Sequence, residues 1–212
     1  MSGVAAMSKR TAVLLDGGFV LLQLRRALGQ RELTADDVLR FAHACIVPGE
    51  ELFRIYYYDC PPFGRPLVHP MSRVVQDFSK TAVYASRTRL LDELEHADHV
   101  AFRAGVLSAG GWKLTYRSQQ DLMKRPRACV ATDFQPDFNQ KRVDMKIGLD
   151  VAWLSSKGIV DRIVLVTADS DFVPAMKFAR REGVQVILVP MGSKYVHKSL
   201  RAHADEVREV SL

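Results

Sequence analysis

The chain has 212 residues and a mass of 23.8 kDa, which fits one large domain or one domain with an inserted segment, and excludes a pair of large independent domains. Its hydrophobic fraction of 48% and charged fraction of 25% are ordinary for a globular protein and exclude a long disordered tract. Lys and Arg outnumber Asp and Glu by 30 to 24, so the net charge is +6 and suits either a polyanionic partner or a solvated basic surface.

The N-terminal third predicts a strand, a tight turn and a helix. Residues 1–10 are expected to form a disordered leader, too short and too weakly apolar for a signal peptide. The apolar run 11–15 is typical of a buried strand, and Asp16 follows it directly, before two glycines. Beyond these glycines we expect helices over 19–28 and 35–45, a strand over 53–59 that also ends in an aspartate, and an irregular proline-rich loop over 61–66.

The middle third is the least regular part of the sequence. Apolar residues recur at helical spacing over 72–96, so the region around 70–98 is expected to be a helical insertion within a single domain that spans 11–212. Strands are expected over 100–107 and 112–116, joined by a hairpin-like turn over 108–111. The segment 117–140 mixes charges with two prolines, and we expect part of it to be mobile.

The C-terminal third alternates helices and strands. The pattern predicts a helix over 144–157, a strand over 162–168, a helix over 172–181 and a strand over 184–190, with a glycine ending each helix. Such alternation favours an α/β fold with a parallel sheet, right-handed crossovers and helices on both faces.

Four aspartates stand at predicted strand ends or at a predicted helix start: Asp16, Asp144, Asp169 and Asp171. In an open α/β sheet the carboxyl ends of the strands line the crevice where ligands bind. Two carboxylates about 4 Å apart repel by roughly 4 kcal/mol at an effective dielectric near 20, so a group of them needs a cation or protons. Because hard cations prefer oxygen ligands, the four aspartates are candidate metal-binding and catalytic residues at a Mg²⁺ or Mn²⁺ site.

These aspartates also have a structural alternative. Asp16, Asp144 and Asp171 each stand where a helix N-cap is expected, and for Asp171 both roles can hold at once. Asp150 lies six residues after Asp144, roughly 240° around the predicted helix, so we assign it to a salt bridge or a supporting role.

Basic residues flank the aspartate at position 144. Lys141, Arg142 and Lys146 surround it with partners for phosphate, and either lysine could stabilise charge at an attacked phosphate or hold the substrate backbone. A longer basic set would suit a nucleic-acid backbone or form a scattered solvated surface, and the sequence favours neither. This set comprises Lys113, Arg117, Lys124, Arg125, Arg127, Lys141, Arg142 and Lys146, and the aromatic residues near it are Trp112, Tyr116 and Phe134.

Other site classes are not indicated. Cys45, Cys60 and Cys129 are odd in number and far apart, which argues against a disulfide framework or a zinc site and fits a reducing cytoplasm. No run of 18 apolar residues predicts a membrane span, so no membrane partner is expected. Dinucleotide, P-loop and GxSxG signatures are absent from the sequence.

Several motifs in a fixed order carry a resemblance to a known family. They are the stretches 12–19, 57–62, 141–146 and 164–174, continued by 180–184 and 200–205. Together they resemble the NYN domain family, in its LabA-like (DUF88) branch within the PIN-like nuclease superfamily. The resemblance covers nearly all of the chain from residue 11 onward.

The resemblance implies a Rossmann-like three-layer α/β/α domain with a mainly parallel central sheet and an acidic cluster that binds Mg²⁺ or Mn²⁺. The implied activity is a metal-dependent ribonuclease that hydrolyses RNA phosphodiester bonds, with RNA as the partner. The chain departs from many relatives at 18–19, where Asn is common, and at positions 142 and 168, where Gly is common. Matched to the family motifs, the acidic cluster would be Asp16, Asp144, Asp169 and Asp171, and the substrate-binding residues would be Lys141, Arg142, Lys146 and Thr167, of which Thr167 takes the small-hydroxyl place.

Two other functions compete with this hypothesis. A catalytically inactive module that binds RNA or protein would use the same fold without the chemistry. A metal-dependent phosphohydrolase of a small metabolite would use the same chemistry in a closed pocket. The sequence does not decide between a monomer and a homo-oligomer.

Overall fold

The computed structural model describes residues 8–194 and 196–210, so most of the expected leader over 1–10 lies outside the described residues. The chain divides into two compact units. Unit 1 comprises 1–59, 90–104 and 142–212, and unit 2 comprises 60–89 and 105–141. A single domain over 11–212, with an insertion around 70–98, stays a prediction.

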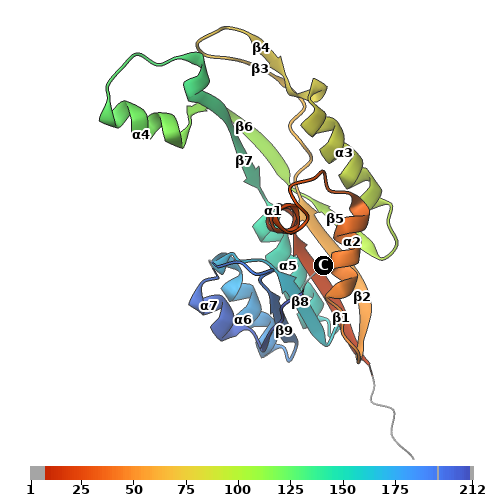
Figure 1. Cartoon of the computed structure of the whole chain (residues 1–212). Helices are drawn as coiled ribbons and strands as arrows, with labels where there is room; N and C mark the ends of the chain where they lie inside the picture. The colour runs from red at the N-terminus through yellow and green to blue at the C-terminus, as the bar shows by residue number, and fades with distance from the viewer. Residues whose placement is uncertain (1–7, 195, 211–212) are drawn as a thin grey trace, which may run out of the picture. The chain divides into compact units, whose positions relative to one another are not determined.

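Unit 1 is built on a six-stranded sheet whose neighbouring strands are all parallel. The strands are β1 (Lys9–Asp16), β2 (Glu50–Asp59), β5 (Val100–Ala104), β8 (Arg162–Val166), β9 (Gln185–Val189) and β10 (Glu206–Val207). Their order is β10-β9-β8-β1-β2-β5, as Figure 1 shows in part. This order confirms the Rossmann-like α/β prediction, because the chain builds outward from β1 first in one direction and then in the other.

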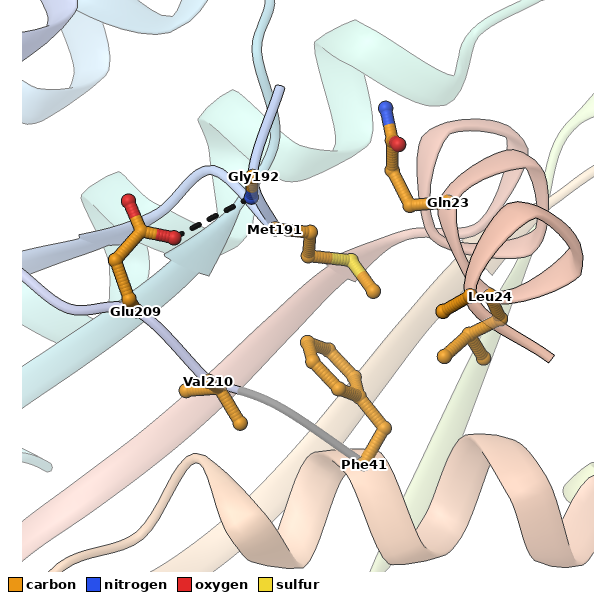
Figure 2. A pocket seen from close by; sticks show the side chains of 8 residues that line it. Gln23, Leu24, Phe41, Met191, Gly192, Glu209 and Val210 are labelled. Carbon is orange, nitrogen blue, oxygen red and sulfur yellow. Dashed lines mark hydrogen bonds between the residues drawn. The ribbon is translucent and has the colours of Figure 1, made fainter. Parts of the chain in front are cut away.

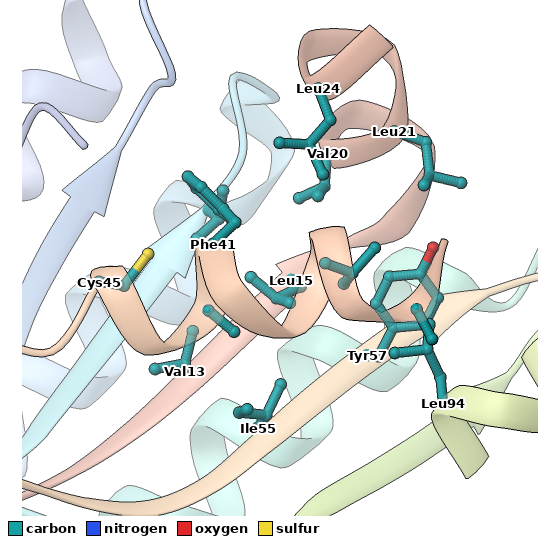
Figure 3. Close-up of a cluster of buried hydrophobic side chains, with 14 of the residues drawn as sticks. Val13, Leu15, Val20, Leu21, Leu24, Phe41, Cys45, Ile55, Tyr57 and Leu94 are labelled. Atoms are coloured by element: carbon teal, nitrogen blue, oxygen red, sulfur yellow. The ribbon is translucent and has the colours of Figure 1, made fainter. Parts of the chain in front are cut away.

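Helices cover both faces of this sheet and complete three layers. Residues 12–15 of β1 are all fully buried, which requires a packed layer on each side of the strand. On one face, Val13 and Leu15 pack with Val20, Phe41 and Leu94 in a single apolar cluster (Figure 3). The helices are α1 (Gly17–Ala27), α2 (Ala35–Ala44), α3 (Ala82–Glu95), α5 (Val143–Ser156), α6 (Val173–Arg181) and α7 (Lys198–His203), and α5 and α6 contact β2 and β9 respectively.

The sheet order places a topological switch point between β1 and β8. These two strands are neighbours, with Leu15 opposite Val166, although about 150 residues separate them in the sequence. The connections that leave their carboxyl ends run in opposite directions, because β1 leads to β2 on one side and β8 leads to β9 on the other. In open α/β sheets ligands bind outside the carboxyl ends of strands at such a point.

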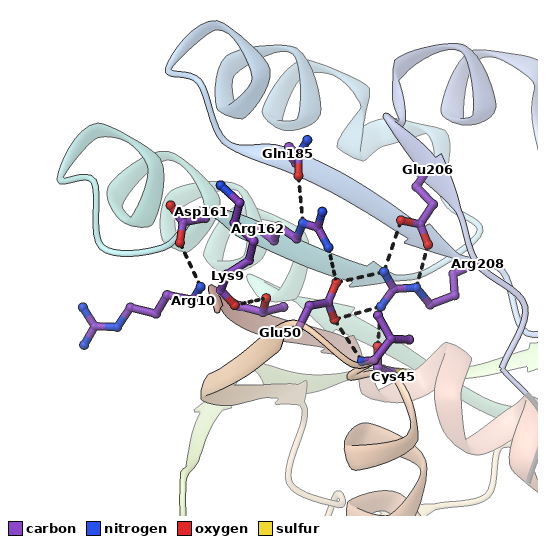
Figure 4. Close-up of polar contacts among 11 residues, drawn as sticks. Lys9, Arg10, Cys45, Glu50, Asp161, Arg162, Gln185, Glu206 and Arg208 are labelled. Atoms are coloured by element: carbon purple, nitrogen blue, oxygen red, sulfur yellow. Dashed lines mark hydrogen bonds and ion pairs between the residues drawn. The ribbon is translucent and has the colours of Figure 1, made fainter. Parts of the chain in front are cut away.

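A buried ion network lies at the opposite, amino-terminal edge of this sheet (Figure 4). The Glu50 side chain is fully buried and accepts hydrogen bonds from Arg162 Nη1 at 2.8 Å and from Arg208 Nη2 at 2.9 Å. Arg208 also donates to the Cys45 carbonyl oxygen at 2.6 Å and to Glu206 at 2.7 Å. One carboxylate therefore joins the starts of β2 and β8 to the chain that follows β10.

Unit 2 contains two antiparallel strand pairs. One pairs β3 (Pro66–Val68) with β4 (Val75–Asp77), and the other pairs β6 (Val106–Leu114) with β7 (Phe134–Lys141). Three phenylalanines pack together with ring centroids 5.2 to 5.8 Å apart: Phe63, Phe78 and Phe138. The remaining elements are η1 (Phe78–Lys80), α4 (Tyr116–Lys124), η2 (Ala131–Asp133) and the first turns of α3.

Two details of the sequence-based prediction are wrong in this region. The expected turn over 108–111 lies inside β6, where Gly111 at φ 93° accompanies a register shift rather than a chain reversal, and β5 pairs with β2 instead of β6. The helix expected from 72 begins only at Ala82, because 75–77 forms β4. The segment 117–140 contains α4, η2 and most of β7.

Among residues 8–194 and 196–210, no helix combines the length and the apolar character needed to cross a membrane.

Candidate active site

Asp16 ends β1 at the switch point and is held by contacts from two directions. Its Oδ1 accepts the Phe19 backbone N–H at 3.3 Å, so Asp16 is the N-cap of α1, as the structural alternative predicts. Its Oδ2 accepts the Thr167 hydroxyl at 3.2 Å. The carboxylate is half-buried above an apolar strand, which makes its charge costly without a cation.

The ionisation of Asp16 reflects this environment. Its pKa is raised to about 6, first by burial and also by the charges of Asp144 and Asp169, against the lowering effect of the hydrogen bonds from Phe19 and Thr167. The pKa of Asp144 is also raised, first by burial and then by the charges of Asp169 and Asp171. The charge of Asp169 therefore acts on both Asp16 and Asp144 at this edge of the sheet.

Asp169 and Asp171 lie in the turn that follows β8. Asp169 Oδ1 accepts the Asp171 backbone N–H at 2.9 Å, so Asp169 caps the short helix η3 (Ser170–Phe172). The cap role considered for Asp171 is wrong, because Phe172 occupies the N-cap position of α6. Both aspartates are exposed, and neither forms an ion pair with another described residue.

Asp144 stands in the first turn of α5 and is exposed. It does not cap that helix, because Arg142 occupies the N-cap position with a left-handed φ of 72° and no side-chain cap. Asp144 thus stays available to a ligand, and its negative charge is placed favourably at the helix N-terminus.

Thr167 supports the acidic edge, by which we mean the edge of the sheet that carries Asp16, Asp144, Asp169 and Asp171. Its side chain is fully buried, and its hydroxyl donates to Asp16 and accepts the Asp169 backbone N–H at 3.1 Å. The buried hydroxyl thus links the end of β1 to the turn after β8. A substrate-binding role of Thr167 stays a prediction.

The three residues predicted to bind phosphate lie on different elements and differ in exposure. Lys141 is exposed at the end of β7, Arg142 is exposed at the start of α5, and Lys146 is half-buried in the first turns of α5. Within the described part of the chain none of them forms an ion pair with a carboxylate. Their role as substrate-binding residues stays a prediction.

Two further aspartates near the sheet have structural partners. Asp150 accepts from Arg103 Nε and from the Tyr58 hydroxyl, each at 2.9 Å, which confirms its assignment to a salt bridge. Asp59 ends β2 beside β1, is buried, and accepts the Tyr57 hydroxyl at 3.0 Å. The predicted site does not include Asp59, although the sequence gives it the same signal as Asp16, an aspartate at a strand end.

Gly17 is required where α1 begins beside β2. A Cβ atom at this position would lie 2.6 Å from the Tyr58 carbonyl oxygen and 2.7 Å from Asp59 Oδ2. We expect Gly17→Ala to lower the free energy of unfolding by about 1–3 kcal/mol, because the Tyr58 carbonyl oxygen is a backbone atom and cannot move without shifting the end of β2. Chemical denaturation of the purified variant measures this change.

Gly148 supplies the matched control for that substitution. It lies inside α5 with no atom within 4 Å of an added Cβ. Gly148→Ala should raise stability by about 0.5–1 kcal/mol through the helix propensity of alanine. Equal effects of both substitutions would contradict the close packing inferred at Gly17.

The carboxylates of the acidic edge have suitable chemistry for binding a metal ion, but they are not spaced to hold one as they stand. Oxygen donors alone suit Mg²⁺ or Mn²⁺, and none of the four aspartates forms an ion pair with another described residue. Among the described residues, however, no three Asp, Glu, His or Cys side chains are grouped closely enough to hold one ion as they stand. The donor set is therefore appropriate, and binding would require side-chain rotations toward a common point.

A separate cavity lies between α1, α2 and the segment after β9 (Figure 2). It has a volume of about 340 Å³, and its apolar lining includes Leu24, Phe41, Met191 and Val210. Its one carboxylate, Glu209, accepts the Gly192 N–H at 3.3 Å. None of the described residues that line it is basic, so this cavity does not suit a phosphorylated metabolite.

Comparisons with known proteins found a matching family model, a relative and a similar structure. Residues 113–211, just under half of the chain, match the model of the NYN domain, which supports the NYN family. An uncharacterized protein of Methanocaldococcus jannaschii is 31% identical over 74 residues, which is 35% of this chain and 31% of that protein. The chain thus spans about a third of the length of this relative.

A crystal structure of a protein of unknown function from Vibrio parahaemolyticus has a similar fold. The two chains superpose with a TM-score of 0.52 at 15% sequence identity, over 100% of this chain and 97% of the other. At this identity the likeness supports the α/β/α fold and no particular activity.

Proposed function

We propose that this protein is a divalent-metal-dependent ribonuclease of the LabA-like branch, using Mg²⁺ or Mn²⁺ to hydrolyse RNA phosphodiester bonds. The observation that carries the proposal is the position of Asp16 at the switch point, where the Thr167 hydroxyl donates to Asp16 and accepts the Asp169 backbone N–H. Burial and the charges of Asp144 and Asp169 raise the pKa of Asp16 there, as is common for carboxylates at functional sites. The match to the NYN domain over 113–211 supports a nuclease.

The four aspartates would hold the ion, and they come from three different elements of the fold. The bound ion would activate water and neutralise charge on the attacked phosphate. Asp16 provides the half-buried ligand, oriented by the Phe19 N–H and the Thr167 hydroxyl. The exposed ligands are Asp144 on α5 and Asp169 and Asp171 in the turn after β8.

The basic residues next to Asp144 would bind the substrate backbone. Lys146 follows Asp144 by two residues on the same helix, about 200° around it, and Arg142 opens that helix with its side chain exposed. Guanidinium and ammonium groups at these positions can pair with phosphate oxygens on either side of the scissile bond. Lys141 would contribute in the same way from the end of β7.

One observation favours the alternative of an inactive RNA-binding module. The described side chains do not form a ready group of three ligands, as a rigid metal site would. This module would bind RNA without hydrolysing it. A small-metabolite phosphohydrolase has less support, because Asp144, Asp169 and Asp171 are exposed, whereas sites for small molecules bury most of the ligand surface.

The deciding experiment is incubation of the purified protein with labelled single-stranded RNA in Mn²⁺, in Mg²⁺ and in EDTA. Wild-type protein should shorten the RNA in one or both metals and leave it intact in EDTA. Asp169→Asn, which keeps the side-chain shape and the cap on η3, should leave the RNA intact in all three conditions. Intact RNA with wild-type protein in every condition would replace the nuclease by the binding module.

A further inference from the structure

The excess positive charge of the chain lies entirely in unit 2. Residues 60–89 and 105–141 carry eleven Lys and Arg against four Asp and Glu, a net charge of +7, whereas the whole chain has +6. Unit 1, which contains all four candidate catalytic aspartates, is therefore close to neutral. A unit of this charge attracts a polyanion, so unit 2 is the place to search for an RNA-binding surface.

Helix α4 presents an unusual exposed face in unit 2. Tyr116 and Met123, one at each end of this nine-residue helix, are 75% and 79% exposed. At 100° per residue the two lie about 20° apart around the helix, with Gln120 beside them and Arg117 and Lys124 along the adjacent edge. We call these five residues the α4 face, and the opposite side of α4 buries Ser118.

The cations of the α4 face are free to bind a ligand. The acidic residue of the helix, Asp121, pairs with Arg127 at 3.2 Å, and Arg127 also holds Asp133 through two hydrogen bonds of 2.7 Å. Arg117 and Lys124 form no ion pair with any described residue. The face therefore combines unpaired positive charge with an exposed aromatic ring.

The other aromatic residues near the basic set are not available for stacking. Trp112 and Phe134 pack against His69, with ring centroids 4.4 and 6.0 Å away, and both are half-buried. Tyr116 has no such partner ring among the described residues and is exposed over three quarters of its surface. An exposed tyrosine beside unpaired cations has a clear use in single-strand binding, where a base stacks on the ring.

We infer that the α4 face binds single-stranded RNA, with a base stacked on Tyr116 and phosphates held by Arg117 and Lys124. The inference rests on the proposed ribonuclease function for the choice of RNA as the polyanion. Single-stranded RNA fits better than a duplex, because stacking on a side chain needs an unpaired base. The thioether of Met123 extends the apolar platform next to the ring.

The test is fluorescence anisotropy with a labelled single-stranded RNA of about 15 nucleotides and a duplex of the same length, in EDTA to prevent cleavage. Tyr116→Ala should weaken binding of the single strand about tenfold, while Tyr116→Phe should bind like wild type, because the ring persists. Arg117→Gln combined with Lys124→Gln should weaken binding and reduce the dependence of log Kd on log salt concentration by about one to two. The wild-type protein should prefer the single strand.

Trp153→Ala in unit 1 is the matched control, since this aromatic residue is 50% exposed on α5, outside the basic unit. It should leave RNA affinity unchanged. Wild-type affinity in Tyr116→Ala, or an equal loss in Trp153→Ala, would overturn the inference. Asp169→Asn separates this result from the proposed function, because it should bind RNA normally and fail to cleave it. If the wild-type protein shows no nuclease activity but Tyr116→Ala still weakens RNA binding, the inference stands and the nuclease proposal fails.

Discussion

Asp16→Asn is expected to abolish RNA cleavage and, at neutral pH, to stabilise the folded protein. Activity should fall by at least about a hundredfold, because loss of a direct metal ligand exceeds the 10- to 100-fold effect typical of residues that only support one. Asparagine keeps the N-cap contact to the Phe19 N–H, so the helix start survives. Activity and stability should therefore change in opposite directions.

The gain in stability follows from the ionisation of Asp16. Its pKa is about 6 in the folded protein against 3.8 for an unperturbed aspartate, so ionisation disfavours the folded state by about 3 kcal/mol once both states are charged. The folded state holds the proton more tightly, so this group lowers stability as pH rises from about 4 to about 6. Loss of the Thr167 hydrogen bond offsets part of the benefit, which leaves a net gain of about 1–2 kcal/mol at pH 7.5.

Chemical denaturation of wild type and Asp16→Asn in EDTA, at pH 4.5 and pH 7.5, measures this effect. The difference between them should be larger at pH 7.5. Burial is the main cause of the raised pKa, and the charges of Asp144 on α5 and Asp169 after β8 add to it. Asp171→Asn is the control, because this exposed residue should lose activity without gaining more than about 0.5 kcal/mol.

Addition of Mn²⁺ gives a readout that does not depend on activity. An ion that binds only the folded state raises Tm in wild type, and Asp16→Asn should lose most of that increase. Two results would remove Asp16 from the proposed site. One is cleavage of RNA by Asp16→Asn at the wild-type rate. The other is a stability gain of Asp16→Asn over wild type that is no larger at pH 7.5 than at pH 4.5.

The strands and helices of unit 1 could be predicted from the sequence because local signals agree with the tertiary structure there. The apolar runs that form β1, β8 and β9 are fully buried, and Gly158 and Gly183 end α5 and α6 with φ values of 58° and 86°. The strand-end position of Asp16 and of the 169–171 turn followed from the same pattern. Long-range pairing was needed to bring those ends together, and only the β1 to β8 register supplies it.

Unit 2 was less predictable because its elements depend on distant partners. The glycines at 110 and 111 are typical of a turn, yet pairing of β6 with β7 carries them through as part of a strand. The full burial of Thr167 is not predictable for a related reason: it comes from neighbouring strands, and no local signal distinguishes a buried hydroxyl from an exposed one. The exposure of Tyr116 likewise depends on packing that the helix sequence does not encode.

Glu50→Ala is expected to lower the free energy of unfolding by about 3–5 kcal/mol. The substitution leaves Arg162 and the nearly buried Arg208 without the carboxylate that they share, and breaking a buried ion pair by removing one partner has this magnitude. The Val47 N–H, which donates to Glu50 at 3.1 Å, also loses its acceptor. Urea denaturation at pH 7.5 measures the loss.

The same residue should contribute to acid unfolding. Burial alone would raise the pKa of Glu50, but the hydrogen bonds from Arg208 and Arg162 outweigh it and hold the pKa below the ordinary value of 4.5. A lowered pKa in the folded state gives stability that is complete above pH 4.5 and is lost as pH falls through the folded value. The stability difference between wild type and Glu50→Gln should therefore shrink on acidification.

Asp36→Asn is the control for this buried network, because it removes one partner of an exposed ion pair. Asp36 pairs with Arg40 at 3.0 Å, but the two side chains are 76% and 58% exposed, so the substitution should change stability by less than about 1 kcal/mol. Glu50 lies at the opposite end of the ten-residue strand β2 from Asp59, about 30 Å from the acidic edge. Glu50→Ala should consequently retain its activity toward RNA at temperatures where it stays folded. If Glu50→Ala lowers the free energy of unfolding no more than Asp36→Asn does, the network does not hold the strand starts together.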